Sequence, residues 1–365
     1  MKNVLIIIGA LRTGGAEKIT VDFVENMDRR GVKIYFLVFG KEIGNYENKV
    51  QQLGCEVLHI EVPKVPYIQY KRNLKSVWKT YGPFDVVHTH TLLNNGINCK
   101  IFDELGCKKI ISHSHSTNSN RKNNVITKIY ESLMKKWIKR YATDYIACGV
   151  EAGEYLYGKE LFLKKGMVIP NGVDVNKFSF NLAIRNDMRK VLGIEDEYVI
   201  GHVARLSEVK NHKFVLEIMK ELKKRKEKYK YIIIGDGPYK KEIIDKVSEL
   251  ELEQDVMFLG NRNDINDLQN AFDLVVYPSF YEGVPVALIE AQMNGIPCIV
   301  SLNVSQEVKI MEYTKFISLE KSPGKWADEV IQYQCVQRKQ NHALPNMKAY
   351  DIKVSAEKLR EIYLG

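Results

Sequence analysis

The chain has 365 residues, 45% of them hydrophobic and 27% charged, a globular composition with room for two α/β domains and a large core. No apolar run approaches the roughly 20 residues that span a bilayer, which excludes an integral membrane protein of the helical kind. The net charge is +9. Residues 1–175 carry 26 Lys and Arg against 17 Asp and Glu, whereas residues 176–365 carry 28 of each, so the whole excess lies in the first half.

Apolar runs of strand length alternate with helical or polar stretches along the chain. They lie at 4–8, 33–39, 55–60, 84–88, 108–112, 144–148 and 167–169, and again at 198–204, 230–235, 255–260, 273–277, 297–301 and 315–319. Such strands are typical of parallel sheets covered on both faces. The two successive groups of strands predict two Rossmann-like domains, with a hinge between them in the turn-rich stretch 169–174. A polar segment, 337–346, has the character of a long crossover, and an amphipathic helix is expected at about 351–363.

The first strand does not resemble a signal peptide, because its apolar run meets Arg12 and Glu17 almost at once. The six cysteines form no C-x-x-C pair, which predicts reduced core residues in a cytosolic protein. The loop after this strand, Gly9 to Lys18, is neither a Walker loop nor G-x-G-x-x-G. Gly14 and Gly15 still allow the backbone to approach a ligand at a helix start, although a flexible turn explains them equally well.

A second candidate site follows a later strand, where residues 110–116 read I-I-S-H-S-H-S. His113 and His115 then lie at the carboxyl edge of the sheet, where open α/β folds bind ligands. His88 and His90 follow another strand. We expect packing and acceptor-side hydrogen bonds for these two, and no metal site, because no carboxylate is interleaved with the four histidines.

Basic residues concentrate in two stretches of the first half. Residues 64–79 hold five basic side chains and no acid, and residues 121–140 hold seven against Glu131. The helix expected at 125–141 also has an apolar stripe, formed by Ile126, Ile129, Tyr130, Leu133 and Trp137. A solvated surface helix and a peripheral contact with an anionic membrane are both compatible with this pattern.

The second half opens with G-H-V-A-R-L-S-E-V-K-N-H at 201–212, which places Arg205 and Lys210 after a strand. Two such cations alone are usually solvated. Gly235-Asp-Gly-Pro and Phe258-Leu-Gly-Asn-Arg follow the next two strands, and turn chemistry alone explains both of these motifs.

Residues 279–297, S-F-Y-E-G-V-P-V-A-L-I-E-A-Q-M-N-G-I-P, are the most informative stretch. A helix is expected from Pro285, at its first position, to Gly295. The free N–H groups of residues 284–287 and the helix dipole form an anion site suited to phosphate. Glu282 stands at its mouth and Glu290 lies further along the helix. The plain alternative is an exposed Glu282 and a solvated Glu290.

Taken together, E-G-x-P-x(4)-E-A with G-x-P, R-L-x-x-x-K-N-H, G-D-G-P, H-S-H and the G-G loop resemble retaining glycosyltransferases of family 4, which have the GT-B fold. The order of these motifs covers nearly the whole chain, and it is most similar to glycosyltransferases of bacterial capsule and exopolysaccharide clusters. The resemblance implies an α/β fold of two Rossmann-like domains facing across a cleft, with a C-terminal helix crossing back to the first domain. It implies an acceptor-side domain at 1–172, a nucleotide-sugar domain at 173–345 and a crossover helix at 346–365.

The resemblance also implies roles for single residues. Glu282 would bind the hydroxyls of the donor sugar, with His115 touching that sugar and His113 as the near alternative. Arg205 and Lys210 would stabilise the leaving diphosphate, since fixed cations stabilise charge that grows in the transition state. Further contacts to the substrates would come from Gly14, Gly15, Gly283, Val286, Ala287, Glu290, Gly260 and Asn261, with Glu290 on the ribose and the backbone of Gly260 and Asn261 near the base.

The predicted function is transfer of a hexosyl unit from a UDP- or GDP-sugar to a saccharide or polyprenyl-linked oligosaccharide, with retention and without metal or cofactor. The expected location is cytoplasmic, peripheral on the inner face of the membrane through residues 64–79 and 121–140, with no nucleic-acid partner. Two rivals stay open: a non-hydrolysing nucleotide-sugar epimerase of the same fold, and a non-catalytic module that binds nucleic acid or membrane. The sequence shows neither an aromatic RNA-binding signature nor helix-turn-helix spacing.

Overall fold

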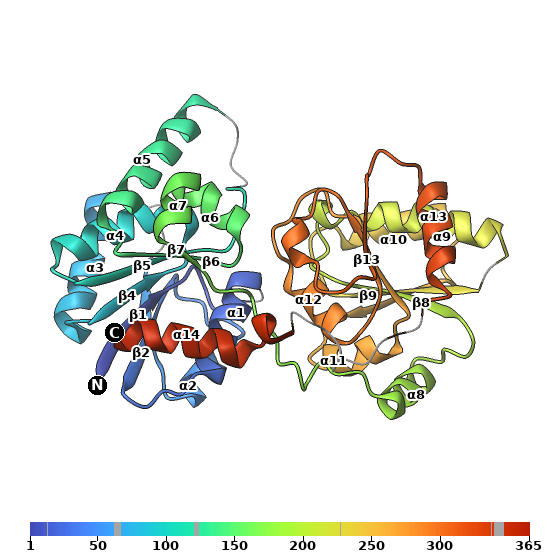
Figure 1. The fold of residues 1–365 in the computed structure, drawn as a ribbon, viewed down its shortest axis with the longest axis horizontal. Coiled ribbons are helices and arrows are strands. Elements are labelled where there is room, and N and C mark those ends of the chain that lie inside the picture. Colours follow the sequence, from blue (N-terminus) through green and yellow to red (C-terminus); the bar gives the residue numbers. More distant parts are fainter. Residues whose placement is uncertain (13, 62–66, 120–123, 227, 337, 339–346) are drawn as a thin grey trace. The chain divides into compact units, whose positions relative to one another are not determined.

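The computed structural model describes the chain except residues 13, 62–66, 120–123, 227, 337 and 339–346. It comprises two compact units, residues 1–172 with 351–365, and residues 173–350 (Figure 1). The expected domain boundary at 345/346 and most of the expected crossover segment lie outside the described residues, as do three basic residues of the two basic stretches, Lys64, Arg121 and Lys122.

The first unit is a parallel sheet with helices on both faces. Within the described residues its seven strands have the order β3-β2-β1-β4-β5-β6-β7. The strands are β1 (Lys2–Ile7), β2 (Val32–Phe39), β3 (Glu56–Ile60), β4 (Val86–Thr89), β5 (Lys109–Ser114), β6 (Asp144–Ala147) and β7 (Gly166–Val168). The helices are α1 (Gly15–Asn26), α2 (Glu47–Gln52), α3 (Tyr67–Tyr81), α4 (Asn95–Glu104), α5 (Val125–Tyr141), α6 (Val150–Tyr157), α7 (Lys159–Lys165) and α14 (Ile352–Leu364).

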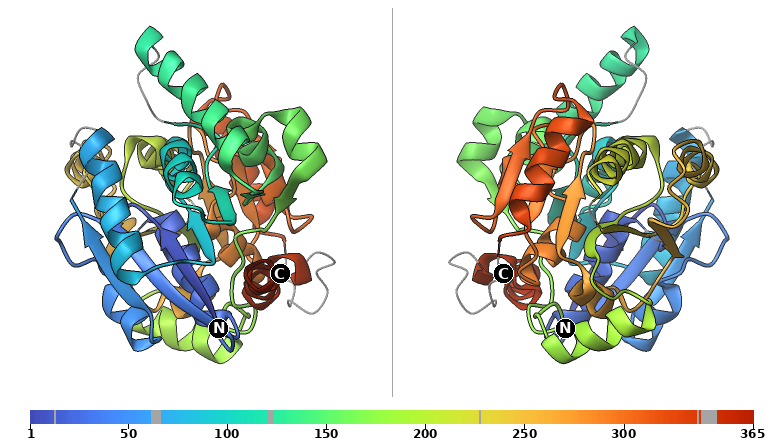
Figure 2. Two further views of the ribbon diagram at one scale, coloured as in Figure 1. Left: turned by 90° about the vertical axis from the view of Figure 1, so that its left-hand side faces the viewer. Right: turned by 90° about the vertical axis from the view of Figure 1, so that its right-hand side faces the viewer.

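Alternation along each strand divides the core of this unit into two apolar clusters. In β1, Leu5 and Ile7 face the cluster under α3 to α7, whereas Val4 and Ile6 face the cluster under α1, α2 and α14. The final helix α14 therefore completes the first unit, as the fold expectation required. It packs against α1, and the Tyr363 hydroxyl lies 2.7 Å from Nδ1 of His88. Figure 2 views α14 end on, in dark red beside the label C.

The second unit repeats the plan with six parallel strands in the order β10-β9-β8-β11-β12-β13 within the described residues. The strands are β8 (Tyr198–Val203), β9 (Tyr229–Ile234), β10 (Val256–Gly260), β11 (Leu274–Tyr277), β12 (Cys298–Ser301) and β13 (Thr314–Ile317). The helices are α8 (Leu182–Val191), α9 (His212–Lys224), α10 (Lys240–Glu249), α11 (Ile265–Leu268), α12 (Val286–Met293) and α13 (Pro323–Tyr333). Apolar clusters again cover both faces of the sheet.

Both sheets reverse their strand order beside their first strand. The order turns at β1 between β2 and β4, and at β8 between β9 and β11. At such a point the loops after neighbouring strands run to opposite faces and leave a crevice at the carboxyl edge. The loops after β8 and β11 carry Lys210 and Glu282, and the loop after β1 carries Gly14 and Gly15. Within the second unit, strand order therefore brings together two motifs, around Lys210 and Glu282, that are far apart in the chain.

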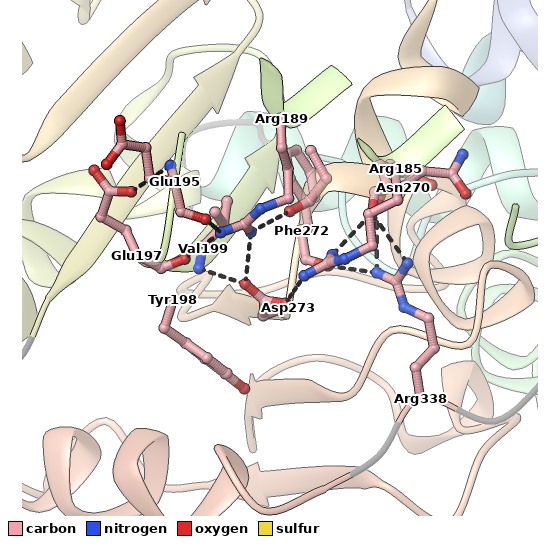
Figure 3. Close-up of polar contacts among 12 residues, drawn as sticks. Arg185, Arg189, Glu195, Glu197, Tyr198, Val199, Asn270, Phe272, Asp273 and Arg338 are labelled. Carbon is pink, nitrogen blue, oxygen red and sulfur yellow. Dashed lines mark hydrogen bonds and ion pairs between the residues drawn. The ribbon is translucent and has the colours of Figure 1, made fainter. Parts of the chain in front are cut away.

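A cluster of arginines around Asp273 lies at the opposite, amino edge of the second sheet. The Asp273 carboxylate accepts hydrogen bonds from Arg185 and, at 3.2 Å, from Arg189, both on α8. Arg338 donates to backbone carbonyls of the turn 269–272. Figure 3 shows Asp273 between Arg189 and Arg185, with Arg338 on the far side of Arg185. One largely shielded carboxylate thus ties α8 to the start of β11, and Arg338 ties the chain after α13 to the turn 269–272.

Candidate functional site

Two loops of the second unit are bonded to each other at the carboxyl edge of its sheet. After β8 the chain forms a short 3-10 turn, Glu208–Lys210, and Asn211 follows with φ of 54°. Asparagine adopts this left-handed conformation more readily than most residues. The N–H of Phe280 donates to the Val209 carbonyl at 2.9 Å, and Nδ2 of Asn211 donates to the Pro278 carbonyl at 3.1 Å. These two bonds hold the loop after β8 against the loop after β11.

Lys210 and Glu282 form an ion pair across these loops. The Lys210 ammonium donates to Oε1 of Glu282 and, at 2.7 Å, to the Tyr277 hydroxyl. Ser279 Oγ donates to the same Glu282 oxygen at 3.1 Å. The side chains of Lys210 and Glu282 are only 17% and 16% exposed, so the pair is well shielded from solvent. The family resemblance implies separate roles for these two residues, and the structure shows that their side chains are in contact.

The helix α12 begins directly beside this pair. The sequence predicts Pro285 at the first helical position, but the helix starts at Val286, so Pro285 is its N-cap. The N–H groups of Leu288 and Ile289 bond to the Pro285 carbonyl, which leaves those of Val286 and Ala287 ahead of the intrahelical ladder. These two N–H groups and the helix dipole favour an anion at the loop that carries Gly283.

Glu290 lies one turn further along α12, on the same side as Val286. Its side chain is buried, with 3% of the residue exposed, so the alternative of a solvated Glu290 is wrong. Glu282 is fixed from its own backbone, because its carbonyl accepts from the Ser305 N–H at 3.0 Å. One carboxylate, Glu282, thus lies just before the start of α12, and the other, Glu290, lies one turn into the helix.

The remaining candidates of the second unit lie on neighbouring loops at the same edge. Arg205 is exposed on the loop after β8, and Asn261 is exposed after Gly260, the last residue of β10. The Gly260 carbonyl accepts from the Gly235 N–H at 2.8 Å. A Cβ on Gly235 would lie 2.0 Å from the Ala204 carbonyl oxygen, so this close approach of two loops requires glycine. The roles of Arg205, Gly260 and Asn261 stay predictions.

In the first unit, Gly14 caps α1 and Gly15 is its first residue. A Cβ on Gly14 would lie 2.1 Å from a carboxylate oxygen of Glu17, whereas the space around Gly15 is open. Burial raises the pKa of Glu17. A carboxylate at the first turn of α1 therefore lies directly over the loop. Glu17 is not among the predicted site residues, although an acidic residue in the first turn of a helix is a recognisable signal.

The four histidines of the first unit form two hydrogen-bonded pairs at the ends of β4 and β5. Nε2 of His88 lies 3.2 Å from Nδ1 of His113, and Nδ1 of His90 lies 2.7 Å from Nε2 of His115. Burial lowers the pKa of all four, to about 3 for His88 and about 4 for His115, so the rings are neutral at neutral pH.

Ring nitrogens of His88, His90 and His113 lie within 4.8 Å of one another, a spacing that a metal ion also requires. The rings also stack on one another, which is the packing expected for His88 and His90. His113 is fully buried and His115 is half-buried. Of the two candidates, His115 is therefore the better placed to meet a ligand.

Comparison with known proteins assigns both units to glycosyltransferase families. A family model described as Glycosyl transferases group 1 matches residues 184–344, and one described as Glycosyltransferase Family 4 matches residues 13–177. The chain is 30% identical to the putative glycosyltransferase EpsF of Bacillus subtilis over 99% of this chain and 96% of that protein. It is 25% identical to the capsular polysaccharide biosynthesis glycosyltransferase CapH of Staphylococcus aureus over 100% and 99% of the two chains.

Two further matches concern substrates and fold. An Escherichia coli UDP-Gal:α-D-GlcNAc-diphosphoundecaprenol α-1,3-galactosyltransferase is 31% identical over 65% of this chain and 63% of that protein. The crystal structure of Anabaena Alr3699/HepE in complex with UDP-glucose superposes with a TM-score of 0.75, at 19% identity, over 98% of this chain and 94% of the other. The likeness in fold confirms the expected pair of Rossmann-like domains.

Proposed function

Because the chain belongs to the group 1, family 4 glycosyltransferases, we propose that it transfers a hexosyl unit from a nucleotide sugar to a lipid-linked saccharide, with retention of anomeric configuration. Transferase activity follows from the family, and the relatives described above, CapH among them, are all glycosyltransferases. Neither the epimerase nor the non-catalytic module gains support. The choice of donor, the stereochemistry and the acceptor are the parts that we propose.

The observation that carries the proposal is the Lys210–Glu282 pair beside the start of α12. An ammonium and two helical N–H groups suit the diphosphate of the donor, and Glu282 suits the hydroxyls of its sugar. Arg205, exposed on the same loop as Lys210, would add a second cation to the diphosphate. Glu290 would bind the ribose, and the backbone at Gly260 and Asn261 would lie near the base.

The chemistry of sugar transfer explains these residue types. Breaking the bond between sugar and phosphate leaves a nucleoside diphosphate with additional negative charge. Fixed cations and helix N–H groups stabilise that charge as it develops. In the first unit, His115 would contact the donor sugar as a neutral imidazole, and Gly14 and Gly15 would let the backbone approach the substrates.

The experiment that tests this function is a donor screen. UDP-, GDP- and ADP-sugars are incubated with the protein, and release of nucleoside diphosphate is measured with and without lipid-linked saccharide acceptors. We expect turnover with a UDP- or GDP-sugar, and an α-linked product from an α-linked donor by NMR. UDP is favoured by the names of the galactosyltransferase from E. coli and the HepE complex. Inversion at C2 of the donor sugar without transfer would instead identify an epimerase.

Activity should survive removal of divalent metal ions. The sequence contains no D-x-D pair that would hold a metal on the diphosphate, and Lys210 with Arg205 would supply the positive charge. Turnover after dialysis against EDTA should stay within about twofold of the untreated protein, a change too small for the loss of an electrostatic contact. Complete loss with chelator, restored by Mg²⁺ or Mn²⁺, would contradict this expectation.

We also propose that the first unit docks on an anionic membrane to reach the acceptor. Within the described residues, no helix combines the length and apolarity that a bilayer crossing requires. Met134 and Ile138 bury one side of α5, while Ile126, Ile129 and Leu133 remain 79%, 64% and 40% exposed. The N-terminal end of α5 stands out from the rest of this unit in both views of Figure 2. Lys128, Lys135, Lys136 and Lys139 lie on the same helix.

Vesicle co-sedimentation tests the docking. Each basic residue near an anionic surface contributes roughly 1 kcal/mol, and the attraction should weaken as the Debye length falls from about 10 Å at 0.1 M salt to about 3 Å at 1 M. We expect pelleting with anionic vesicles at low salt and little with neutral ones. Ile129→Ser should weaken binding more than tenfold, since roughly 2 kcal/mol of side-chain burial is lost. Leu182→Ser, at the 61% exposed Leu182 of α8, is the matched control. Equal pelleting with both lipids would contradict the proposal.

A further inference from the structure

The hydroxyl of Tyr277 is the second partner of the Lys210 ammonium. Tyr277 is the last residue of β11, and its hydroxyl oxygen lies 2.7 Å from Lys210 Nζ. The ammonium also lies 5.1 Å from the centre of the Tyr277 ring. Lys210 therefore contacts one group on a flexible carboxylate side chain, Glu282, and one group on a ring that is anchored in the sheet.

The Tyr277 ring has little freedom to move. The residue is 1% exposed and packs in the apolar cluster of the second unit, with its ring 4.8 Å from that of His202 on β8. Nδ1 of His202 and Nδ1 of His212 both lie within 3.1 Å of the hydroxyl of Tyr231 on β9. A buried layer of aromatic and imidazole rings thus supports the edge of the sheet directly beneath the candidate site.

We propose that Tyr277 is a positioning residue that holds the Lys210 ammonium in place when Glu282 turns to the donor sugar. The inference rests on the proposed function, in which Lys210 meets the diphosphate and Glu282 meets sugar hydroxyls. In the structure the charge of Lys210 is balanced by Glu282. When the nucleotide sugar binds Glu282 through its hydroxyls, the ion pair between Glu282 and Lys210 weakens. At that moment Lys210 must be aligned on the diphosphate.

Lysine has four methylene groups and a single point of charge, so a mobile ammonium would lose alignment without a second contact. The Tyr277 hydroxyl supplies that contact from a fixed strand. Burial raises the pKa of Tyr277, and the neighbouring Glu282 raises it further. The hydroxyl therefore stays neutral at neutral pH. The hydroxyl oxygen accepts a hydrogen bond from Lys210, and its O–H can donate a hydrogen bond to Glu282 or to an oxygen of the nucleotide sugar.

The decisive variant is Tyr277→Phe, which removes one oxygen and keeps the ring against His202. With the donor found by the screen, we expect kcat to fall about tenfold while KM stays within about twofold, because alignment matters most as charge develops. Tyr231→Phe is the matched control, since Tyr231 is buried at 0% exposure and its hydroxyl contacts the two histidines and not Lys210. Its kcat should remain within about twofold of the wild-type value.

A double-mutant cycle separates positioning from mere packing. Inorganic pyrophosphate, a diphosphate without base or sugar, serves as the binding probe in calorimetry, alongside the kinetics. Free pyrophosphate carries the additional charge that develops on the diphosphate as it leaves, so it reports this alignment more directly than the KM of the intact donor. Tyr277→Phe should therefore weaken pyrophosphate binding roughly fivefold in the wild-type background and leave it unchanged in Lys210→Ala, because a residue that acts through Lys210 has nothing left to position.

The outcomes distinguish this inference from the proposed function. Wild-type-like pyrophosphate binding and turnover in Lys210→Ala would overturn the role of Lys210 and, with it, the proposed site. A large effect of Lys210→Ala combined with wild-type behaviour of Tyr277→Phe would overturn only the inference about Tyr277. Equal losses from Tyr277→Phe in both backgrounds would show that the hydroxyl acts independently of Lys210, which also overturns it.

Discussion

Lys210→Ala and Glu282→Ala should each lower the rate of sugar transfer by roughly 100-fold or more, the usual cost of removing one preorganised electrostatic contact. Both side chains are shielded and bonded to each other, and they lie beside the start of α12. Their loss removes charge from the point where the diphosphate and the sugar would bind. The measurement is steady-state transfer from the donor that the screen identifies, with circular dichroism to show that each variant is folded.

Two variants serve as controls for this result. Lys213→Ala removes an exposed cation three residues after Lys210 and should leave turnover within about twofold, because surface charges contribute little. Glu282→Gln keeps the shape of the side chain and an acceptor for Ser279, so it tests charge alone. Wild-type-like turnover in Lys210→Ala or Glu282→Ala would remove the assigned role of that residue.

Asp273→Ala should destabilise the second unit by about 3–5 kcal/mol, the typical cost of removing one partner from a buried ion pair. Its carboxylate is the acceptor for Arg185 and Arg189, whose side chains are only 20% and 13% exposed. Burial and the nearby Arg185 already lower the pKa of Arg338, which shows how little solvent shields this cluster. Urea denaturation followed by tryptophan fluorescence and circular dichroism measures the loss.

The matched control is Asp264→Ala. Asp264 pairs with Arg262 on the surface, where both side chains are more than one third exposed, so its loss should cost less than about 1 kcal/mol. If Asp273→Ala unfolded at the same urea concentration as Asp264→Ala, the arginine cluster would contribute no net stability.

The elements of this fold could be predicted from the sequence because its strands are nearly continuous apolar runs. Each of the thirteen strands in the described part of the chain lies within about two residues of its expected range, and α5 occupies Val125–Tyr141, the range expected for it. Buried parallel strands leave this signal because both of their faces are covered. No comparable sequence pattern encodes the order of the strands within a sheet, so the points where the order reverses, beside β1 and β8, are seen only in the structure.

For the candidate site, too, the sequence predicts local features but not the contacts between distant segments. Glycine and proline punctuation predicted the start of α12, because backbone conformation is a local property. Contact between Lys210 and Glu282 depends on β8 and β11 being neighbours, which no local pattern reveals. In the sequence, Tyr277 is only the last residue of an apolar strand, where a tyrosine is typical of the core. The position of Glu17 beside Gly14 is likewise a three-dimensional feature that the residue pattern alone does not reveal.

The joint origin of the first unit from residues 1–172 and 351–365 has a consequence for synthesis on the ribosome. Residues 1–172 emerge first, yet the apolar face that α14 covers, with partners on α1 and at His88, has to wait for the last residues of the chain. Residues 173–350 form one continuous segment that needs no later part of the chain, so this unit can fold once the whole segment has left the exit tunnel. We therefore expect a chain that ends at residue 350, once released from the ribosome, to hold a protease-resistant second unit together with a first unit that is still open to cleavage and to chaperones.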